Sequence, residues 1–161
     1  MNTITIRPIQ KKDNLQIAAV IRQVLIALNV PKVGTAYADP QLDVMFETYS
    51  LPNSIYFVVE KDGVIIGGAG VSQLENEAPI ICELQKMYFL SEARGLGIGL
   101  KMMQKCLESA RDFGYKKCYL ETMPYMEAAQ KLYKKVGFDY ICAPMGNTGH
   151  VSCPVWMLIE L

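Results

Sequence analysis

The sequence has little of what would mark a membrane, secreted or disulfide-rich protein. No apolar run reaches the roughly 18 residues that a membrane-spanning helix needs, so we expect no membrane association. The first fourteen residues lack the hydrophobic core of a signal peptide, which argues against secretion. The five cysteines are odd in number and form no CxxC pair, so reduced thiols in a cytoplasmic protein are expected.

Excess charge and metal ligands are also scarce. Lys+Arg and Asp+Glu both number 16, so the net charge is zero and nucleic acid is not an expected partner. His150 is the single histidine of the sequence. Together with Cys153 and the nearby Cys142 it would offer three metal ligands, whereas a zinc site needs about four ligands. A Cys153–His150 nucleophile pair has no further signature in the sequence. We therefore expect no metal.

The charges that are present are unevenly placed. Residues 94–135 carry nine Lys/Arg and four Asp/Glu, a net charge of +5, so the rest of the chain carries −5. Solvated helix faces explain most such runs. The alternative is that the basic part meets an anion and the rest meets something neutral or cationic.

Hydrophobic periodicity in these 161 residues predicts one domain, 1–161, of alternating strands and helices. Strands are expected at 3–9, 80–90, 116–122, 138–143 and 153–161, with a hairpin at 55–74. Four helices are expected. The first follows an Asp13–Gln16 capping pair and the second covers 41–50. The third ends near Gly114 and carries an apolar stripe from Leu96 to Ala110, and the fourth covers 124–136. Gly67, Gly68 and Gly70 suggest a bulge or a close backbone approach in the second arm of the hairpin. This order predicts an α/β (α+β) fold, a mixed sheet of about seven strands with helices on both faces.

Three alternate glycines, Gly95, Gly97 and Gly99, stand where the third helix should begin, although each weakens a helix by about 1 kcal/mol. A helix start has unpaired N–H groups and partial positive charge, and a glycine turn lets an anion approach them. A tight turn without a ligand is the alternative. The dinucleotide-binding pattern G-x-G-x-x-G does not fit, because its third glycine position is Leu100 when counted from Gly95 and Met102 when counted from Gly97. The nucleoside triphosphate pattern G-x-x-x-x-G-K-S/T does not fit either, because Leu100 stands at its second glycine position.

The segment "RGLGIG", 94–99, resembles the Q/R-x-x-G-x-G/A motif of the GNAT superfamily of acyl-CoA-dependent N-acetyltransferases. The preceding "LQKMYFLSEA" is similar to that family's fourth strand, and "AAQKLYKKVGF", 128–138, resembles its A-x-x-L-Y-x-K-x-G-F helix. Motif similarity covers about residues 83–138. The resemblance implies a three-layer fold with a mostly antiparallel sheet, and acetyl-CoA as the acyl donor.

The resemblance also implies which residues hold acetyl-CoA. The backbone of Met87 and Phe89, on either side of Tyr88, would pair with the pantetheine arm. Met126 stands where the family often has an asparagine, and so replaces a polar contact to that arm. The turn that would grip the pyrophosphate comprises Arg94, Gly95, Leu96, Gly97, Ile98 and Gly99.

Acetyl transfer to an amine of pKa ~10.4 needs a base and a proton donor for the leaving thiolate. Glu83 is the candidate base. Period two places it on one face with Gln85, Met87 and Phe89, although a bulge would break that parity, and a half-exposed structural glutamate is the alternative. The Phe89 amide is a candidate oxyanion donor.

Tyr133 aligns with the family's general acid, and a packed tyrosine on the apolar helix face is the alternative. The resemblance also implies that the loop before the last strand borders the acceptor site. Asn147, Thr148 and His150 are therefore candidates for acceptor binding, together with Tyr37.

These observations favour an N-acetyltransferase that moves an acetyl group to a primary amine of a small molecule, peptide or protein. The amine would attack directly and form a tetrahedral intermediate. A non-catalytic acyl-CoA-binding sensor on the same fold is the alternative from another class, ahead of a dinucleotide oxidoreductase and a structural domain. The resemblance also makes a homodimer possible, because dimers are common in that fold, and the sequence does not decide between a monomer and a dimer.

Overall fold

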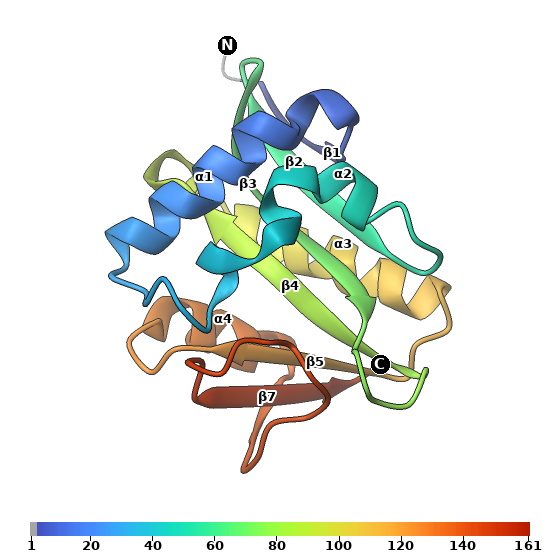
Figure 1. The fold of residues 1–161 in the computed structure, drawn as a ribbon. Helices are drawn as coiled ribbons and strands as arrows, with labels where there is room; N and C mark the ends of the chain where they lie inside the picture. The colour runs from blue at the N-terminus through green and yellow to red at the C-terminus, as the bar shows by residue number, and fades with distance from the viewer. Residues whose placement is uncertain (1–2) are drawn as a thin grey trace.

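The computed structural model describes residues 3–161, whose strands form one sheet in the order β1-β2-β3-β4-β5-β7-β6 (Figure 1). All neighbouring strands are antiparallel except β4 and β5. The predicted mixed, mostly antiparallel sheet is confirmed. The strands are β1 Ile4–Pro8, β2 Ile55–Lys61, β3 Val64–Gln73, β4 Ile81–Phe89, β5 Lys117–Thr122, β6 Asp139–Ile141 and β7 Val155–Glu160.

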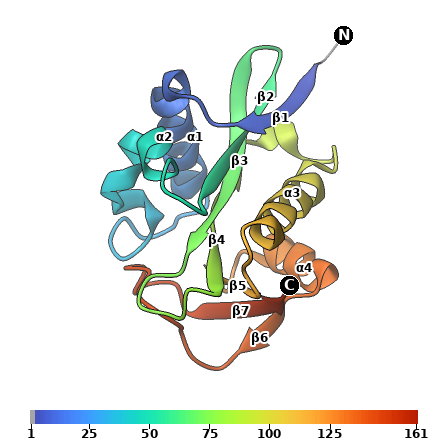
Figure 2. The same cartoon turned by 90° about the vertical axis from the view of Figure 1, so that its right-hand side faces the viewer.

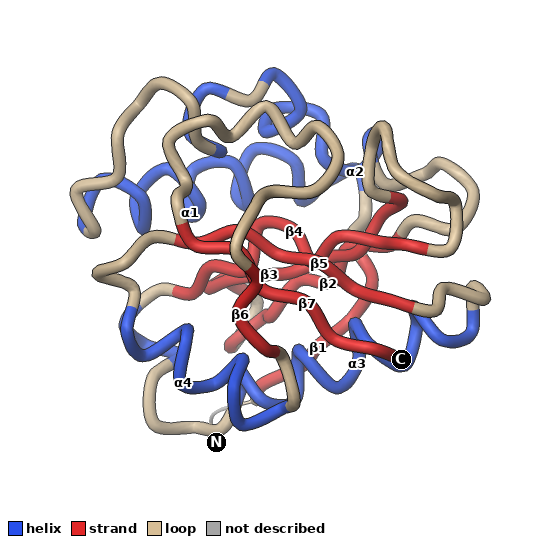
Figure 3. The backbone as a smooth tube through the Cα atoms, turned by 90° about the horizontal axis from the view of Figure 1, so that it is seen from below, coloured by secondary structure: helices blue, strands red, loops and turns tan. Residues whose placement is uncertain are grey.

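The helices cover both faces of this sheet, as expected. Helices α1 (Asn14–Ala27) and α2 (Met45–Thr48) lie on one face, and α3 (Ile98–Asp112) and α4 (Glu127–Val136) lie on the other (Figure 2). The view from below shows the same three layers, with the strands between two groups of helices (Figure 3). No helix within residues 3–161 combines the length and hydropathy that crossing a bilayer requires.

The two larger of the three buried clusters within residues 3–161 lie on opposite faces of the sheet, because side chains alternate along the strands. On β2, Phe57 and Val59 pack in the cluster under α3, whereas Tyr56 and Val58 pack in the cluster under α1. Helix α3 contributes the side chains of Ile98, Met102, Met103, Cys106, Leu107 and Ala110. The predicted stripe is wrong at its first member: Leu96 precedes the helix and is 45% exposed.

Two local predictions are corrected by the structure. The segment predicted as a helix over 41–50 is a 3-10 helix, Pro40–Val44, followed by the single turn of α2, because Val44 leaves the helical conformation with φ −133°. Asp13 does not cap α1 through its side chain. Its buried carboxylate instead accepts from the N–H of Gln10 and pairs with Arg7 at 2.8 Å, the cation that burial of a charge requires.

A bulge lies opposite the β3 glycines, but its extra residue belongs to β4 rather than to the strand that carries the glycines. The alternative, a close backbone approach, is also found, since a Cβ on Gly67 would lie 2.7 Å from the carbonyl oxygen of Tyr88. Between the pairs Gly70–Gln85 and Gly68–Tyr88, two residues of β4 oppose one of β3. Lys86 adopts φ +50° there, and the hydroxyl of Tyr56 donates to its carbonyl at 2.8 Å.

This extra residue overturns the predicted parity of β4. Before the bulge, Leu84 packs under α3, so Glu83 and Gln85 point to the face of α1 and α2. After it, Met87 and Phe89 pack under α3, on the opposite face from Glu83. The four residues therefore do not share a face.

Candidate active site

The site lies where the parallel strands β4 and β5 part. Their pairing covers only Ile81–Glu83 of β4 and Lys117–Tyr119 of β5. Beyond it a cleft of about 860 Å³ opens between the strands, and its lining includes residues of the loop after α1 and of the loop before β7. Of the candidate residues, the cleft lining includes Glu83, Met87, Tyr88, Phe89, Arg94, Met126, Tyr133, Asn147, Thr148 and His150.

The backbone of β4 offers free hydrogen-bonding groups to this cleft. Leu90 donates its N–H to Ile66 of β3 at 2.8 Å. Because N–H and C=O groups alternate in direction along a strand, those of Met87 and Phe89 point away from β3, toward β5. No strand among residues 3–161 pairs with that part of β4 on this side. The edge could therefore accept an extended ligand as an added strand.

The glycine turn at the end of β4 leaves the start of α3 open. Gly95 and Gly97 adopt φ +74° and +69°, a region that side chains disfavour, and the space around both is empty. Gly97 is the N-cap of α3 and has no side chain to occupy the first N–H groups. Gly99 serves packing instead, since a Cβ there would lie 3.0 Å from Leu132 of α4. The turn thus has the geometry of an anion site, with Arg94 on the cleft wall.

Glu83 is buried rather than half-exposed, with 6% of its surface accessible. Burial raises the pKa of this carboxyl group to about 7, although the hydrogen bond from Gln85 and the charge of His150 pull it down. The amide of Gln85 donates to Glu83 Oε1 at 2.6 Å, and Tyr49 donates to the amide oxygen of Gln85. This chain of bonds fixes the carboxylate at the mouth of the β4–β5 opening. A carboxyl group with a pKa near 7 can accept a proton at physiological pH.

Tyr133 enters the cleft from α4, on the other side of the opening. Its ring packs edge-on against Phe138 with a centroid distance of 5.9 Å, and burial raises the pKa of its phenol well above the usual value. Both positions considered for Tyr133 from the sequence are therefore compatible: its ring is packed on the apolar helix face, and the residue also lines the cleft. We find no hydrogen bond from its hydroxyl group to the rest of residues 3–161. The hydroxyl group is therefore available to a ligand.

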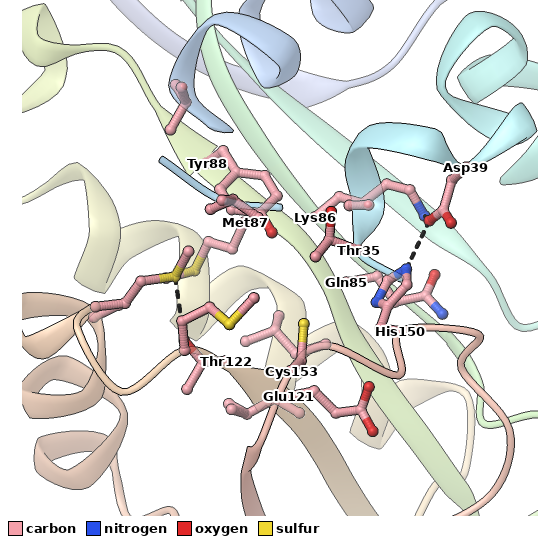
Figure 4. Close-up of a pocket in the computed structure, with 18 of the residues that line it drawn as sticks. Thr35, Asp39, Gln85, Lys86, Met87, Tyr88, Glu121, Thr122, His150 and Cys153 are labelled. Atoms are coloured by element: carbon pink, nitrogen blue, oxygen red, sulfur yellow. Dashed lines mark hydrogen bonds and ion pairs between the residues drawn. The ribbon is translucent and has the colours of Figure 1, made fainter. Parts of the chain in front are cut away.

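A charged cluster that the sequence did not reveal faces the same cleft. The carboxylate of Asp39 lies 2.8 Å from His150 Nε2 and 3.5 Å from Lys86 Nζ (Figure 4). Burial alone would lower the pKa of His150, but the hydrogen bond and charge of Asp39 outweigh it and raise that pKa. Asp39 and His150 are far apart in the chain, and Lys86 reaches the cleft only through the bulge. No local sequence signal could have joined them.

The remaining acceptor-side candidates are divided between the cleft and its surroundings. Thr148 donates to Glu121 Oε1, and Tyr119 donates to Glu121 Oε2 at 2.6 Å. Glu121 thus joins Glu83 and Asp39 as a cleft carboxylate; the sequence marks it only as a near mimic of the ribose-binding acid of a dinucleotide site. Asn147 is held by the carbonyl of Glu75. Tyr37 is not among the cleft-lining residues of the described chain; its ring lies 5.3 Å from Lys32 Nζ.

Met126 and the cysteines complete the description of the site. Met126 lines the cleft and its sulfur accepts from the hydroxyl of Thr122 at 3.3 Å. Cys153 also lines the cleft, and all five cysteines carry free thiols. Among residues 3–161, no group of three or more His, Cys, Asp or Glu side chains is placed to hold a metal ion.

Comparison with known proteins identifies the family. The model of the acetyltransferase (GNAT) family matches residues 23–138. The chain is 45% identical over 157 residues to YjgM, an uncharacterized N-acetyltransferase of Escherichia coli, covering 96% of this chain and 93% of that protein.

Solved structures agree in fold. A GNAT-family acetyltransferase from Staphylococcus aureus Mu50 superposes with a TM-score of 0.87 at 19% identity, over 98% of this chain and 99% of that one. The structure of yncA from Salmonella typhimurium with its cofactor acetyl-CoA gives a TM-score of 0.77 at 20% identity, over 98% of this chain and 94% of that one. With a parted parallel strand pair, a glycine turn and these relatives, the chain belongs to the GNAT family of acetyltransferases.

Proposed function

We propose that this protein transfers an acetyl group from acetyl-CoA to a primary amine, and that residues 1–161 act as one catalytic domain in the cytoplasm. The observation that carries this proposal is the opening between β4 and β5, with an unpaired strand edge on one side and a glycine turn at its end. A family neighbour solved with acetyl-CoA supports the choice of donor. The free thiols fit a reducing compartment.

Acetyl-CoA would bind along the free edge of β4. The N–H and C=O groups of Met87 and Phe89 would pair with the amides of the pantetheine arm. The amides between Arg94 and Gly99 would hold the pyrophosphate at the start of α3, where partial positive charge favours an anion. Tyr88 and Met126 line the same cleft and would pack beside the arm.

The residues at the mouth of the opening would then handle the protons. Glu83, directly or through a water molecule, takes a proton from the acceptor ammonium, and the freed amine attacks the thioester carbonyl. The N–H of Phe89 stabilises the oxyanion of the tetrahedral intermediate. The C–S bond breaks as Tyr133 gives its proton to the departing thiolate. The raised pKa of Tyr133 keeps the phenol protonated until that moment. The nitrogen of the intermediate loses its second proton through water, which restores the phenol of Tyr133, and the amide product leaves.

Thermal unfolding with and without acetyl-CoA, beside NAD and ATP, tests the donor site. A ligand at about 100 times its dissociation constant adds roughly 2.7 kcal/mol of stability, so a shift with acetyl-CoA alone is expected. Acetyl-CoA-dependent thiol release with a panel of amines tests turnover. A shift without turnover on any amine would favour the non-catalytic sensor, and no shift would overturn the proposal.

A further inference from the structure

Lys86 is the most unusual charged residue of the cleft. Its side chain is only 7% exposed, it stands on the β4 bulge in a left-handed conformation, and it lines the cleft. Its stem is buried, whereas Nζ keeps access to the cleft, because no fully buried side-chain nitrogen or oxygen within residues 3–161 lacks a hydrogen-bond partner. An ammonium group with so little water around it gains from a partner of opposite charge. Its nearest carboxylate oxygen, on Asp39, is 3.5 Å away, beyond the usual hydrogen-bond distance. No hydrogen bond from Lys86 Nζ to the rest of residues 3–161 is found.

The ammonium group of Lys86 has two neighbours, the ring of Tyr49, whose centroid lies 6.0 Å from Nζ, and the carboxylate of Asp39, which is shared. Asp39 Oδ2 also bonds to His150 Nε2 at the shorter distance of 2.8 Å. One carboxylate therefore serves two basic groups, and the ammonium group keeps its three N–H donors for something in the cleft. The chemistry that fits these donors is a monoanionic oxygen group. A phosphate dianion fits less well, because Asp39, Glu83 and Glu121 are close enough to repel it.

A complementary charge lies on the β5 side of the cleft. Both oxygens of Glu121 accept from neutral hydroxyl groups, those of Thr148 and Tyr119. Its negative charge has no cation among these partners, and it faces the same space as Glu83, whose pKa its charge raises. This carboxylate favours a cationic group on the acceptor. In Figure 4, Glu121 and the Lys86–Asp39–His150 cluster lie at different heights of one cleft, with Cys153 between them.

We propose that the acceptor is an amino-acid-like zwitterion, whose carboxylate binds Lys86 and His150 while its ammonium group lies between Glu121 and Glu83. This assignment rests on the proposed function and specifies the acceptor of that same site. Glu83 then receives the proton of an ammonium group that Glu121 has helped to place. Lys86 acts here as a specificity-determining residue, since it recognises the carboxylate and does not touch the reacting atoms.

The test compares free amino acids with their carboxamides, which keep the amine and lose the negative charge. With acetyl-CoA saturating, kcat/KM is measured for the twenty amino acids, their amides and a set of simple primary amines. At least one amino acid is expected to exceed its amide by about tenfold or more, the size of one charge-assisted contact. Lys86→Gln should reduce this acid-to-amide ratio by about ten- to hundredfold, through KM for the acid, and Lys86→Arg should retain much of the ratio.

The matched control is Lys12→Gln, an exposed lysine outside the cleft lining, which should leave the ratio as in the wild type. Thermal unfolding of each variant checks that the fold is intact. Amides or simple amines that equal or exceed every amino acid, or a ratio that Lys86→Gln does not alter, would overturn the zwitterion and leave the transferase in place. Transfer to no acceptor at all would overturn both.

Discussion

At the residue scale, the burial of Glu83 governs how the rate should vary with pH. A base must be ionised to act, and the pKa of Glu83 is about 7, so kcat/KM should rise as the pH increases through 7. Glu83→Gln should remove this rise and lower the rate by about a hundredfold or more. The titration of the acceptor amine, which lies higher, is common to both enzymes and serves as the internal reference. Initial rates between pH 5.5 and 9 measure both effects.

The same substitution has a second readout that separates a fold defect from loss of a base. The folded pKa of Glu83 lies above its ordinary value of 4.5, so ionisation of the buried carboxyl group opposes folding, and the cost grows as the pH rises from 4.5 to 7. It reaches about 3 kcal/mol above pH 7 as an upper bound. Glu83→Gln should therefore be more stable than the wild type at pH 8, with a smaller difference at pH 5. A variant that is less stable at pH 8 would contradict this ionisation cost and point to a fold defect, whereas a variant that is active with an unchanged pH profile would remove Glu83 from the mechanism.

Tyr133 allows a cleaner separation of binding from chemistry. Removing only its hydroxyl group, in Tyr133→Phe, leaves the ring packed against Phe138 and breaks no hydrogen bond that we find within residues 3–161. Stability and acetyl-CoA affinity should therefore stay near the wild-type values. The rate constant kcat should fall by about ten- to hundredfold, because the thiolate leaves without its proton donor. Equal kcat values in wild type and variant would leave Tyr133 with a packing role alone.

The sequence could single out Glu83 and Tyr133 because each lies in a segment with a recognisable pattern. It could not single out Asp39, which stands in the loop before Pro40 and meets His150 only through tertiary folding. Lys86 escaped for a different reason. A lysine in the sequence gives no indication of a left-handed backbone conformation. The conformation of Lys86 is supported by the hydroxyl group of Tyr56, which donates to the Lys86 carbonyl from β2. The side chains that line the acceptor side depend on such long-range contacts.

At the element scale, a substitution in the turn before α3 should affect both the stability of the fold and the binding of acetyl-CoA, and the two effects can be measured separately. Gly97→Ala places a Cβ in open space at φ +69°, so it should cost about 1 kcal/mol of stability through the backbone alone. It should also weaken acetyl-CoA binding, because the strained turn shifts the amides of the α3 start. Calorimetric titration with acetyl-CoA and thermal unfolding measure the two effects separately.

Gly63→Ala provides the matched control for this experiment. Gly63 has φ +84° in the β2–β3 turn, also with no atom within 4 Å of an added Cβ, and lies outside the cleft lining. It should lose a similar amount of stability and bind acetyl-CoA as the wild type does. Equal affinities for Gly97→Ala and Gly63→Ala would contradict an anion-binding role for the α3 turn.

The elements themselves were largely predictable, and the exceptions have physical causes. The β2–β3 hairpin follows from its Asp62–Gly63 turn, and α4 ends at Gly137 as expected. The prediction of a helix over 41–50 is wrong because a 3-10 helix, Pro40–Val44, packs the buried apolar side of this segment against α1. The parity of β4 fails because a bulge reverses it. Periodicity describes regular structure well and has no means of locating an inserted residue.

At the scale of the whole molecule, charge is divided unevenly along the chain. Residues 94–135, which include the α3 turn, carry +5, whereas the rest of the chain carries −5. A neutral protein can therefore present a basic region to a polyanion. Such long-range attraction between exposed charges is screened over about 10 Å at 0.1 M salt.

Salt should accordingly affect the two substrates differently. Raising NaCl from 0.02 to 0.5 M should increase KM for acetyl-CoA several-fold, because the phosphates meet exposed basic residues, whereas a net-neutral acceptor held by buried charges should change much less. Lys101→Gln, on the exposed side of the first turn of α3, should reduce the salt dependence for acetyl-CoA, and Lys12→Gln, outside residues 94–135, should not. Steady-state kinetics at four salt concentrations with each substrate varied in turn would decide the matter. Equal salt dependence for both substrates would mean that the charge asymmetry reflects solvated helix faces and plays no part in recognising the donor.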